Sequence, residues 1–379
     1  DEPIESNRRL FVGKLGIFMA IYAAVYALFH MLALNGVSIS EWTGIDLPFL
    51  PTFPMETWNF RIVHIAGALV LGFVLFAGAR FVSSEEGGAR HRWTTWISAA
   101  AILPALYVLY QTFSFWQMVQ NGAMRIPAEL EVWHFGWPLL AATGVGIVMS
   151  WFHQRERSVF SVPDLVLIVC SLAVAAYFLV VYNTSMRMST GTSFAPVGIS
   201  FAAIAGTALI MELTRRVAGM ALVIIGLVFL AYVFAGPYLP GFLGYPGLSV
   251  QRFFSQVYTD AGILGPTTAV SSTYIILFII FAAFLQSSKV GDYFVNFAFA
   301  AAGRSRGGPA KVSIFASGLM GMINGTSAGN VVSTGSLTIP LMKKVGYSKQ
   351  SAGAVEAAAS TGGQIMPPIM GAGAFIMAE

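Results

Sequence analysis

Long apolar runs dominate this sequence and restrict it to one class of fold. Eight of them approach or exceed the length of about 20 residues that a helix needs to cross a bilayer core. They cover residues 11–34, 61–82, 94–119, 133–152, 164–182, 195–213, 217–235 and 266–286. A ninth apolar stretch, about 347–379, is interrupted. Because helices satisfy their backbone polar groups within one segment, as lipid requires, the sequence predicts an all-α, polytopic membrane protein.

Composition supports the same class. Charged residues make up 10% of the 379 residues and hydrophobic residues 56%, whereas soluble domains carry roughly 25% charged residues. So little charge cannot cover a water-exposed surface, so the predicted solvent is the lipid bilayer. The basic residues are dispersed between apolar runs, which argues against a nucleic-acid partner. The sequence has no Gly-x-x-x-x-Gly-Lys loop and no Cys/His metal spacing, so ATP-driven transport by this chain alone is unsupported.

The distribution of Lys and Arg predicts the orientation. With the N-terminus in the cytoplasm, 17 of the 21 basic residues lie on the cytoplasmic side, and only Arg61, Arg125, Arg187 and Arg252 lie outside. Short cytoplasmic loops carry such an excess of cations. The same rule requires the stretch between Lys311 and Lys343 to enter and leave the membrane on one side.

That stretch predicts a re-entrant helical hairpin. Two apolar segments of 12 residues, 312–323 and 331–342, flank a polar run, and neither alone crosses a core about 30 Å thick. The tip would place polar groups near the midplane, those of Asn324, Thr326, Ser327 and Asn330. One long tilted helix is the alternative, but the flanking Lys residues and the glycines of the polar run disfavour it.

The last apolar segment predicts a broken helix. Pro367 and Pro368 remove two N–H donors that a helix would direct to the carbonyls of Gly363 and Gln364. Carbonyls left free at membrane depth need a partner, and a cation is one candidate. A simple proline kink, with a hydroxyl group or water on the carbonyls, is the alternative.

Two other features carry competing interpretations. Residues 325–329 match the G-x-S-x-G nucleophile pattern, which requires a strand-to-helix turn; because the context is helical, an intramembrane serine hydrolase is a remote alternative. Glu356 is an acid well inside the last segment and could serve proton coupling. It also lies two turns from Lys349, so a snorkelling or paired structural role is equally open.

Five stretches carry a resemblance to tripartite ATP-independent periplasmic (TRAP) transporters, most of all to the fused membrane permease of the branch with a TAXI-type binding protein. They are Glu212-Leu-Thr-Arg-Arg-Val-Ala-Gly219, Ala235-Gly-Pro-Tyr-Leu-Pro-Gly241, Gly303-Arg-Ser-Arg-Gly-Gly-Pro-Ala-Lys311, Gly335-Ser-Leu-Thr-Ile-Pro-Leu-Met-Lys343 and Gly353-Ala-Val-Glu-Ala-Ala-Ala-Ser-Thr-Gly-Gly-Gln-Ile-Met-Pro-Pro-Ile-Met-Gly371. Strong resemblance covers about 160–379.

The resemblance implies an elevator-type secondary transporter of the bacterial inner membrane. It would receive a dicarboxylate-like organic acid from a periplasmic TAXI-type binding protein and couple uptake to a cation, usually sodium, with no other cofactor. A channel or a proton-coupled transporter of different mechanism is the alternative. The implied parts are a small-subunit-like four-helix scaffold (1–160), connecting helices (161–216) and the first half of a large transport subunit (217–379), with the hairpin at 308–343 and the broken helix at 347–379.

The resemblance also implies site residues. The cation-binding set is Ser327, Asn330, Gly363, Met366 and Pro368, mostly through backbone carbonyls. The substrate-binding set is Asn324, Gly325, Thr326, Gly362 and Gln364. The tip departs from the family's frequent Ser-Gly-Ser, because Asn-Gly-Thr stands there. The family carries an inverted second repeat, so we expect the remainder of the permease beyond Glu379 as a further partner.

Overall fold

The computed structural model describes residues 7–37, 55–79, 81, 92–123, 125–153, 157, 159–183, 187–188 and 195–378. Within these ranges the regular elements are helices, apart from one isolated β-bridge between Arg8 and Phe76. Eight of the described helices are long and apolar enough to cross a membrane, and each coincides with a predicted run. The all-α polytopic fold is therefore confirmed.

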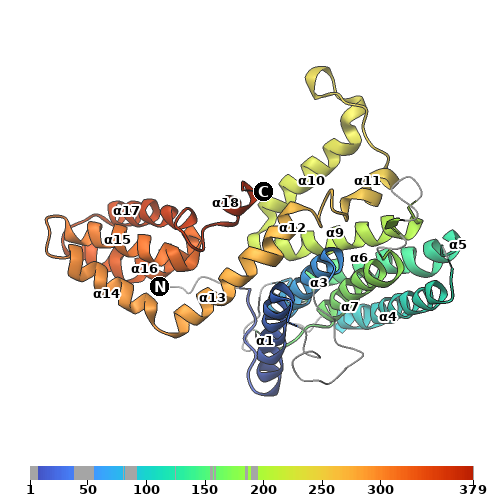
Figure 1. Ribbon diagram of the computed structural model, residues 1–379, viewed down its shortest axis with the longest axis horizontal. Helices are drawn as coiled ribbons and strands as arrows, with labels where there is room; N and C mark the ends of the chain where they lie inside the picture. The colour runs from blue at the N-terminus through green and yellow to red at the C-terminus, as the bar shows by residue number, and fades with distance from the viewer. Residues whose placement is uncertain are drawn as a thin grey trace. The chain divides into compact units, whose positions relative to one another are not determined.

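The chain forms two compact units, and each is described by itself. The first comprises residues 1–26 and 55–265. Its helical segments are the start of α1 (Lys14–Asn35), α3 (Thr57–Leu75), α4 (Arg92–Gln120), α5 (Ala128–Leu130), η2 (Glu131–Gly136), α6 (Trp137–Phe152), α7 (Val162–Ala176), η3 (Tyr177–Val181), α9 (Val197–Ala218), α10 (Met220–Ala235), η4 (Gly236–Tyr238), η5 (Gly241–Leu243) and α11 (Val250–Val257). Helices α4, α6, α7 and α9 form the packed centre of this unit (Figure 1).

Buried charges join the N-terminal segment, α3, α7 and α9 of this unit. Asp164 is fully buried and accepts from Arg9 on one carboxylate oxygen and from Arg216 Nη1, at 2.7 Å, on the other. Arg216 also reaches Glu212 at 2.7 Å. The Arg9 guanidinium donates to the carbonyls of Phe73 and Val74, at the end of α3. These arginines, counted above as cytoplasmic loop cations, therefore also join the N-terminal segment to α3, α7 and α9.

A second buried acid anchors the other end of α9. Glu131 accepts from the Tyr177 hydroxyl at 2.7 Å and from the backbone N–H of Gly198 at 3.1 Å. Gly198 lies on the first turn of α9, where free N–H groups and the helix dipole favour a negative charge. Asp164, through Arg216, and Glu131 thus hold the two ends of α9.

The second unit comprises residues 27–54 and 266–379. After α1 its helical segments are α12 (Pro266–Val270), η6 (Ser271–Ile275), α13 (Ile276–Ser287), α14 (Val290–Ala302), α15 (Gly308–Asn324), α16 (Ser327–Lys344), α17 (Lys349–Thr361), η7 (Gly362–Gln364) and α18 (Ala372–Ile376). Helices α15, α16 and α17 contact one another, and α14 lies against α15 (orange to red in Figure 1).

The predicted hairpin and the predicted helix break are both present. Helices α15 and α16 pair through a two-residue turn, and α17 ends well before α18 begins. The hairpin helices, of 17 and 18 residues, are longer than the predicted segments of 12. Helix α15 begins earlier, at Gly308, and α16 takes in most of the polar run. Neither is among the eight described helices suited to span a membrane. Re-entry from one side stays a prediction.

The charge cluster of the first unit yields a stability prediction. Asp164→Ala leaves Arg9 and Arg216 buried without their shared partner, so we expect the free energy of unfolding to fall by about 3 kcal/mol. Asp260→Ala is the matched control, since Asp260 is 60% exposed in its pair with Arg187 and such pairs contribute about 1 kcal/mol or less. Denaturant or thermal unfolding in detergent measures both. Equal losses would contradict the assigned role of the cluster.

Candidate functional site

The hairpin tip is a tight turn built by two residues. Gly325 ends α15 with φ +59°, a conformation that glycine adopts without strain. Thr326 then caps α16, and its hydroxyl accepts from the N–H of Gly329 at 3.1 Å. A Cβ on Gly325 would lie 2.5 Å from the carbonyl oxygen of Met370. The tip therefore packs directly against the loop of the broken helix.

The broken helix changes direction after Gln364. Helix α17 ends at Thr361, a 3-10 turn covers Gly362–Gln364, and α18 starts at Ala372. The N–H of Gly371 donates to the carbonyl of Gln364 at 2.6 Å. The prediction that this carbonyl is free is therefore wrong: the chain turns back beyond the prolines and supplies another donor. For Gly363 the prediction is confirmed, since no backbone N–H of the described residues donates to its carbonyl.

Two glycines bring the hairpin and the broken helix into backbone contact. A Cβ on Gly321, in α15, would lie 2.6 Å from the Cα of Gly363. A Cβ on Gly363 would lie 2.9 Å from the side-chain nitrogen of Asn330. The three residues come from α15, η7 and α16, and any larger side chain at either glycine would separate them. The role of Gly321 was missed in the sequence, where it stands as one of several small residues in an apolar stretch.

Asn330 carries the unusual atom of this contact. Its side chain is fully buried, and its Nδ2 donates to the carbonyl of Ser317 at 2.8 Å. Its Oδ1 is buried and accepts no hydrogen bond from the described residues. An unsatisfied buried polar atom costs about 1–3 kcal/mol, so such an atom requires an explanation. Two oxygen atoms, the Oδ1 of Asn330 in α16 and the carbonyl oxygen of Gly363 in η7, therefore lack a backbone donor among the described residues.

The other predicted cation ligands are not joined to this pair. Ser327 is half-buried on the first turn of α16, and Pro368 is exposed. The carbonyl of Met366 accepts from the N–H of Met370 at 3.3 Å. The structure thus brings Asn330 and Gly363 together, whereas the hydrogen bonds of the described residues connect neither of them to the remaining three.

Some of the predicted substrate residues line a pocket of about 330 Å³ at the hairpin tip. Asn324 and Thr326 lie on its wall, Gly325 is buried between them, and Gly362 and Gln364 are not among the lining residues. The remaining wall is mostly apolar: Ile279, Ala282, Ala283, Ile323, Gly329 and Ile369. The pocket therefore combines a small polar edge, at the N-terminus of α16, with an apolar surface from α13 and the broken helix.

Glu356 lies at the centre of the three-helix bundle of α15, α16 and α17. It is fully buried, and five hydroxyl groups donate to its carboxylate. Ser313, Ser317 and Ser360 do so at 2.7, 3.1 and 3.0 Å, and Thr334 and Thr338 complete the set.

This environment excludes the snorkelling role for Glu356. A snorkelling side chain reaches the interface, whereas this one has no exposed surface. The ion pairs of the described residues do not include it either. The hydroxyl residues were missed in the sequence, but a signal exists: each helix carries its polar residues four positions apart, which places them on one face. These pairs are 313/317, 334/338 and 356/360.

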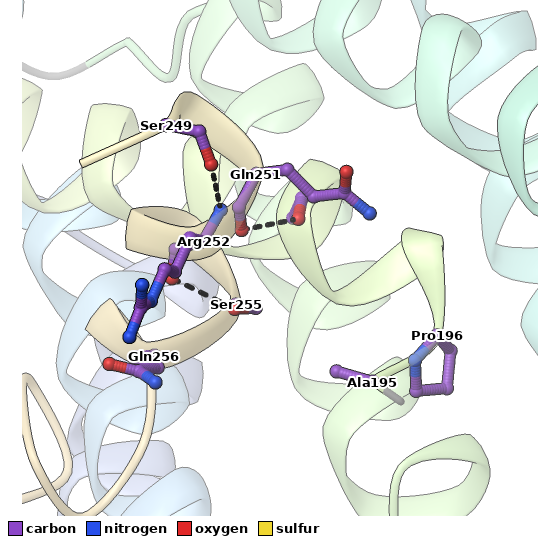
Figure 2. Close-up of a pocket in the computed structure, with 8 residues that line it drawn as sticks. Ala195, Pro196, Ser249, Gln251, Arg252, Ser255 and Gln256 are labelled. Atoms are coloured by element: carbon purple, nitrogen blue, oxygen red, sulfur yellow. Dashed lines mark hydrogen bonds between the residues drawn. The ribbon is translucent and has the colours of Figure 1, made fainter. Parts of the chain in front are cut away.

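A second pocket, of about 340 Å³, lies in the first unit between α9 and α11. Figure 2 shows its lining residues, and their polar groups serve local structure: Ser249 accepts from the N–H of Arg252, and Ser255 donates to the carbonyl of Arg252. Ser200 donates to the carbonyl of Gln251 at 3.4 Å. The first two bonds lie within α11 and its cap, and the third attaches α11 to α9. Together they do not create a convergent site.

The hydrolase alternative fails on geometry. The G-x-S-x-G pattern falls on a helix-turn-helix, with Ser327 on the first turn of α16. A nucleophile elbow requires a strand before the turn, and a helix precedes it here.

Comparison with known proteins covers the part of the chain that contains these residues. Residues 205–379 match the family described as "Tripartite ATP-independent periplasmic transporter, DctM component". The chain is 37% identical over 91 residues to the C4-dicarboxylate TRAP transporter large permease protein DctM of Vibrio cholerae serotype O1, over 24% of this chain and 20% of that protein. It is 30% identical over 151 residues to the protein of that name from Rhodobacter capsulatus, over 39% of this chain and 34% of that protein. The chain thus spans about a third or less of the length of these relatives. No solved structure matches it.

The glycine contact yields a second prediction. Gly321→Ala places a methyl group 2.6 Å from backbone of the broken helix, so we expect a loss of about 1–3 kcal/mol in the free energy of unfolding. Gly353→Ala, in the middle of α17, is the matched control, because its Cβ meets no atom within 4 Å. That change is expected to stabilise the protein by up to about 1 kcal/mol. Thermal unfolding in detergent compares the two, and a neutral Gly321→Ala would rule out the tight contact.

Proposed function

We propose, from the premise that residues 205–379 belong to the DctM component family of TRAP transporters, that the chain is part of a membrane permease that imports an organic acid with a cation. The family is one of transporters and not of enzymes. The curated relatives are named C4-dicarboxylate transporters, which supports a dicarboxylate-like substrate. We propose sodium as the coupling ion and a periplasmic binding protein, of the TAXI type, as the donor of substrate.

One observation carries the cation site: the buried Oδ1 of Asn330 without a donor. Oxygen atoms are the ligands that hard cations prefer, and transporters place carbonyls of broken helices on such ions. The carbonyl of Gly363, which has no backbone donor among the described residues, is the second oxygen. Ser327, Met366 and Pro368 are the further proposed ligands, and they would have to move toward Asn330 and Gly363 when the ion binds.

The pocket at the hairpin tip supports the substrate site. The first turn of α16 carries no acidic residue, so the positive end of its dipole is available to a carboxylate. Asn324 and Thr326 lie beside that helix end on the pocket wall. Gly325, Gly362 and Gln364 remain proposed substrate-binding residues.

The mechanism we propose is of the elevator type. Helices α15, α16 and α17 share the carboxylate of Glu356 through hydroxyl groups from each helix, which favours movement of the three as one body. With the N-terminus in the cytoplasm of a bacterium, the segment from η4 to α11 faces the periplasm. The binding protein would deliver substrate on that side of the inner membrane.

Proton coupling is the second candidate, and Glu356 carries it. A fully buried acid without an ion-pair partner among the described residues can take up a proton, and intramembrane acids often form proton relays. Sodium is favoured because Asn330 and Gly363 present oxygen atoms that do not titrate.

The sodium site predicts the outcome of two substitutions. In the complete permease, Asn330→Ala removes the orphan oxygen, and Gly363→Ala places a methyl group 2.9 Å from the Asn330 nitrogen. We expect each to raise the half-saturating sodium concentration about tenfold or more, the typical loss when a metal site is disturbed. Uptake of a C4-dicarboxylate into proteoliposomes with the binding protein present measures this.

Asn296→Ala, on the exposed face of α14, is the control and keeps the wild-type sodium dependence. If all three variants match the wild type, the assigned cation site is incorrect. Uptake without saturation and without a binding protein would instead indicate a channel.

Uptake driven by an imposed sodium or proton gradient identifies the coupling ion. We expect an inward sodium gradient to drive uptake at constant pH, and an inward proton gradient to drive none in sodium-free medium. Glu356→Gln is then expected to retain a sodium requirement. If a proton gradient alone drives uptake, and Glu356→Gln abolishes that uptake, the permease is proton-coupled and the sodium proposal is overturned.

A further inference from the structure

We propose that Glu356 is a positioning residue, which orients the amide of Asn330 so that its oxygen faces the cation. This inference rests on the proposed sodium site. Glu356 itself contributes no atom to that site. The inference follows from how the five hydroxyl groups divide between the two carboxylate oxygens of Glu356.

The two carboxylate oxygens take their hydroxyl donors from two successive helical turns of the bundle. Oε2 accepts from Ser313 and Thr338. Oε1 accepts from Ser317, Thr334 and Ser360. All three also lie within hydrogen-bond distance of Asn330, whereas no hydrogen bond of the described residues joins Ser313 or Thr338 to it.

The bonds to Asn330 run through both its side chain and its backbone. Its Nδ2 donates to the carbonyl of Ser317 at 2.8 Å, and it lies 3.5 Å from the carbonyl of Ser360. The hydroxyl of Thr334 lies 2.9 Å from the backbone carbonyl of Asn330, one turn earlier in α16. Ser317 and Ser360 thus connect Glu356 to the Asn330 amide, whereas the single hydroxyl proton of Thr334 can go either to Glu356 or to the Asn330 carbonyl.

This arrangement selects one orientation of the amide. The Ser317 and Ser360 side chains both donate to Glu356 Oε1, which ties together the turns of α15 and α17 whose backbone carbonyls lie beside Asn330. A flipped amide would turn its oxygen toward two carbonyl oxygens, neither of which is a donor. The nitrogen therefore stays on the carbonyls, and the oxygen stays unpaired for a cation. Outer-layer partners orient metal ligands in the same way in other sites.

The division provides a test with matched variants. Each of five changes removes one hydroxyl group from the same carboxylate: Ser317→Ala, Thr334→Val and Ser360→Ala on the Oε1 side, and Ser313→Ala and Thr338→Val on the Oε2 side. The Oε1-side hydroxyls also contact one another, Ser317 lying 3.1 Å from Thr334 and 3.3 Å from Ser360, so the structural loss of each variant is measured separately. Thr361→Val, beside Ser360 but exposed, is the surface control.

The measurement is binding of sodium itself. The Tm of the purified complete permease is followed as NaCl replaces choline chloride at constant ionic strength, and the Tm in choline alone reports folding. We expect the Oε1-side variants to raise the half-saturating sodium concentration about tenfold. The Oε2-side variants should raise it less than about threefold, and Thr361→Val should leave it at the wild-type value.

Each outcome decides the inference. Equal shifts on both sides, or no shift on the Oε1 side, would overturn the positioning role while leaving the sodium site intact. A wild-type permease whose Tm does not respond to sodium would overturn the sodium site and the inference with it. A shift confined to the Oε1 side, with the Tm in choline lowered equally in all five variants, supports the positioning role.

Discussion

The structure depends on one constraint: within lipid, a polar group must find its partner inside the protein. In the first unit the constraint is met by ion pairs at Asp164, which is shared between two arginines, and by hydrogen bonds to Glu131 at the start of α9. In the second unit it is met by neutral hydroxyl groups around Glu356. A hydroxyl cluster of this kind binds three helices together without a fixed counter-charge.

The features that follow from local rules could be predicted from the sequence. Span length is set by bilayer thickness, so all eight spans were found near their observed positions. The hairpin followed from two short apolar segments around a Gly-rich run, and the helix break from two consecutive prolines. The loss of a backbone donor at Gly363 also follows from local chemistry alone, because proline has no N–H to give to the carbonyl four residues earlier.

Features that depend on how segments meet could not be predicted. The carbonyl of Gln364 also loses its helical donor, yet the returning chain replaces it with the N–H of Gly371. The partners of Glu356 come from three helices, and their convergence depends on the rotation of each helix about its axis. Polar residues four positions apart indicate a polar face, but not which faces meet. The Gly321–Gly363 contact was missed for the same reason.

The exceptions to the constraint are then the informative atoms. Where nearly every buried polar atom of the bundle of α15, α16 and α17 is satisfied, the Oδ1 of Asn330 stands out. The Asn330 side chain packs against Gly363, whose carbonyl has no backbone donor among the described residues. Two oxygens are fewer than the ligands that a hard cation gathers, so a bound ion needs further oxygens, from water or from residues that move toward it. Under the proposed function, a cation that draws those oxygens toward Asn330 would complete the contact between hairpin and broken helix before the body moves.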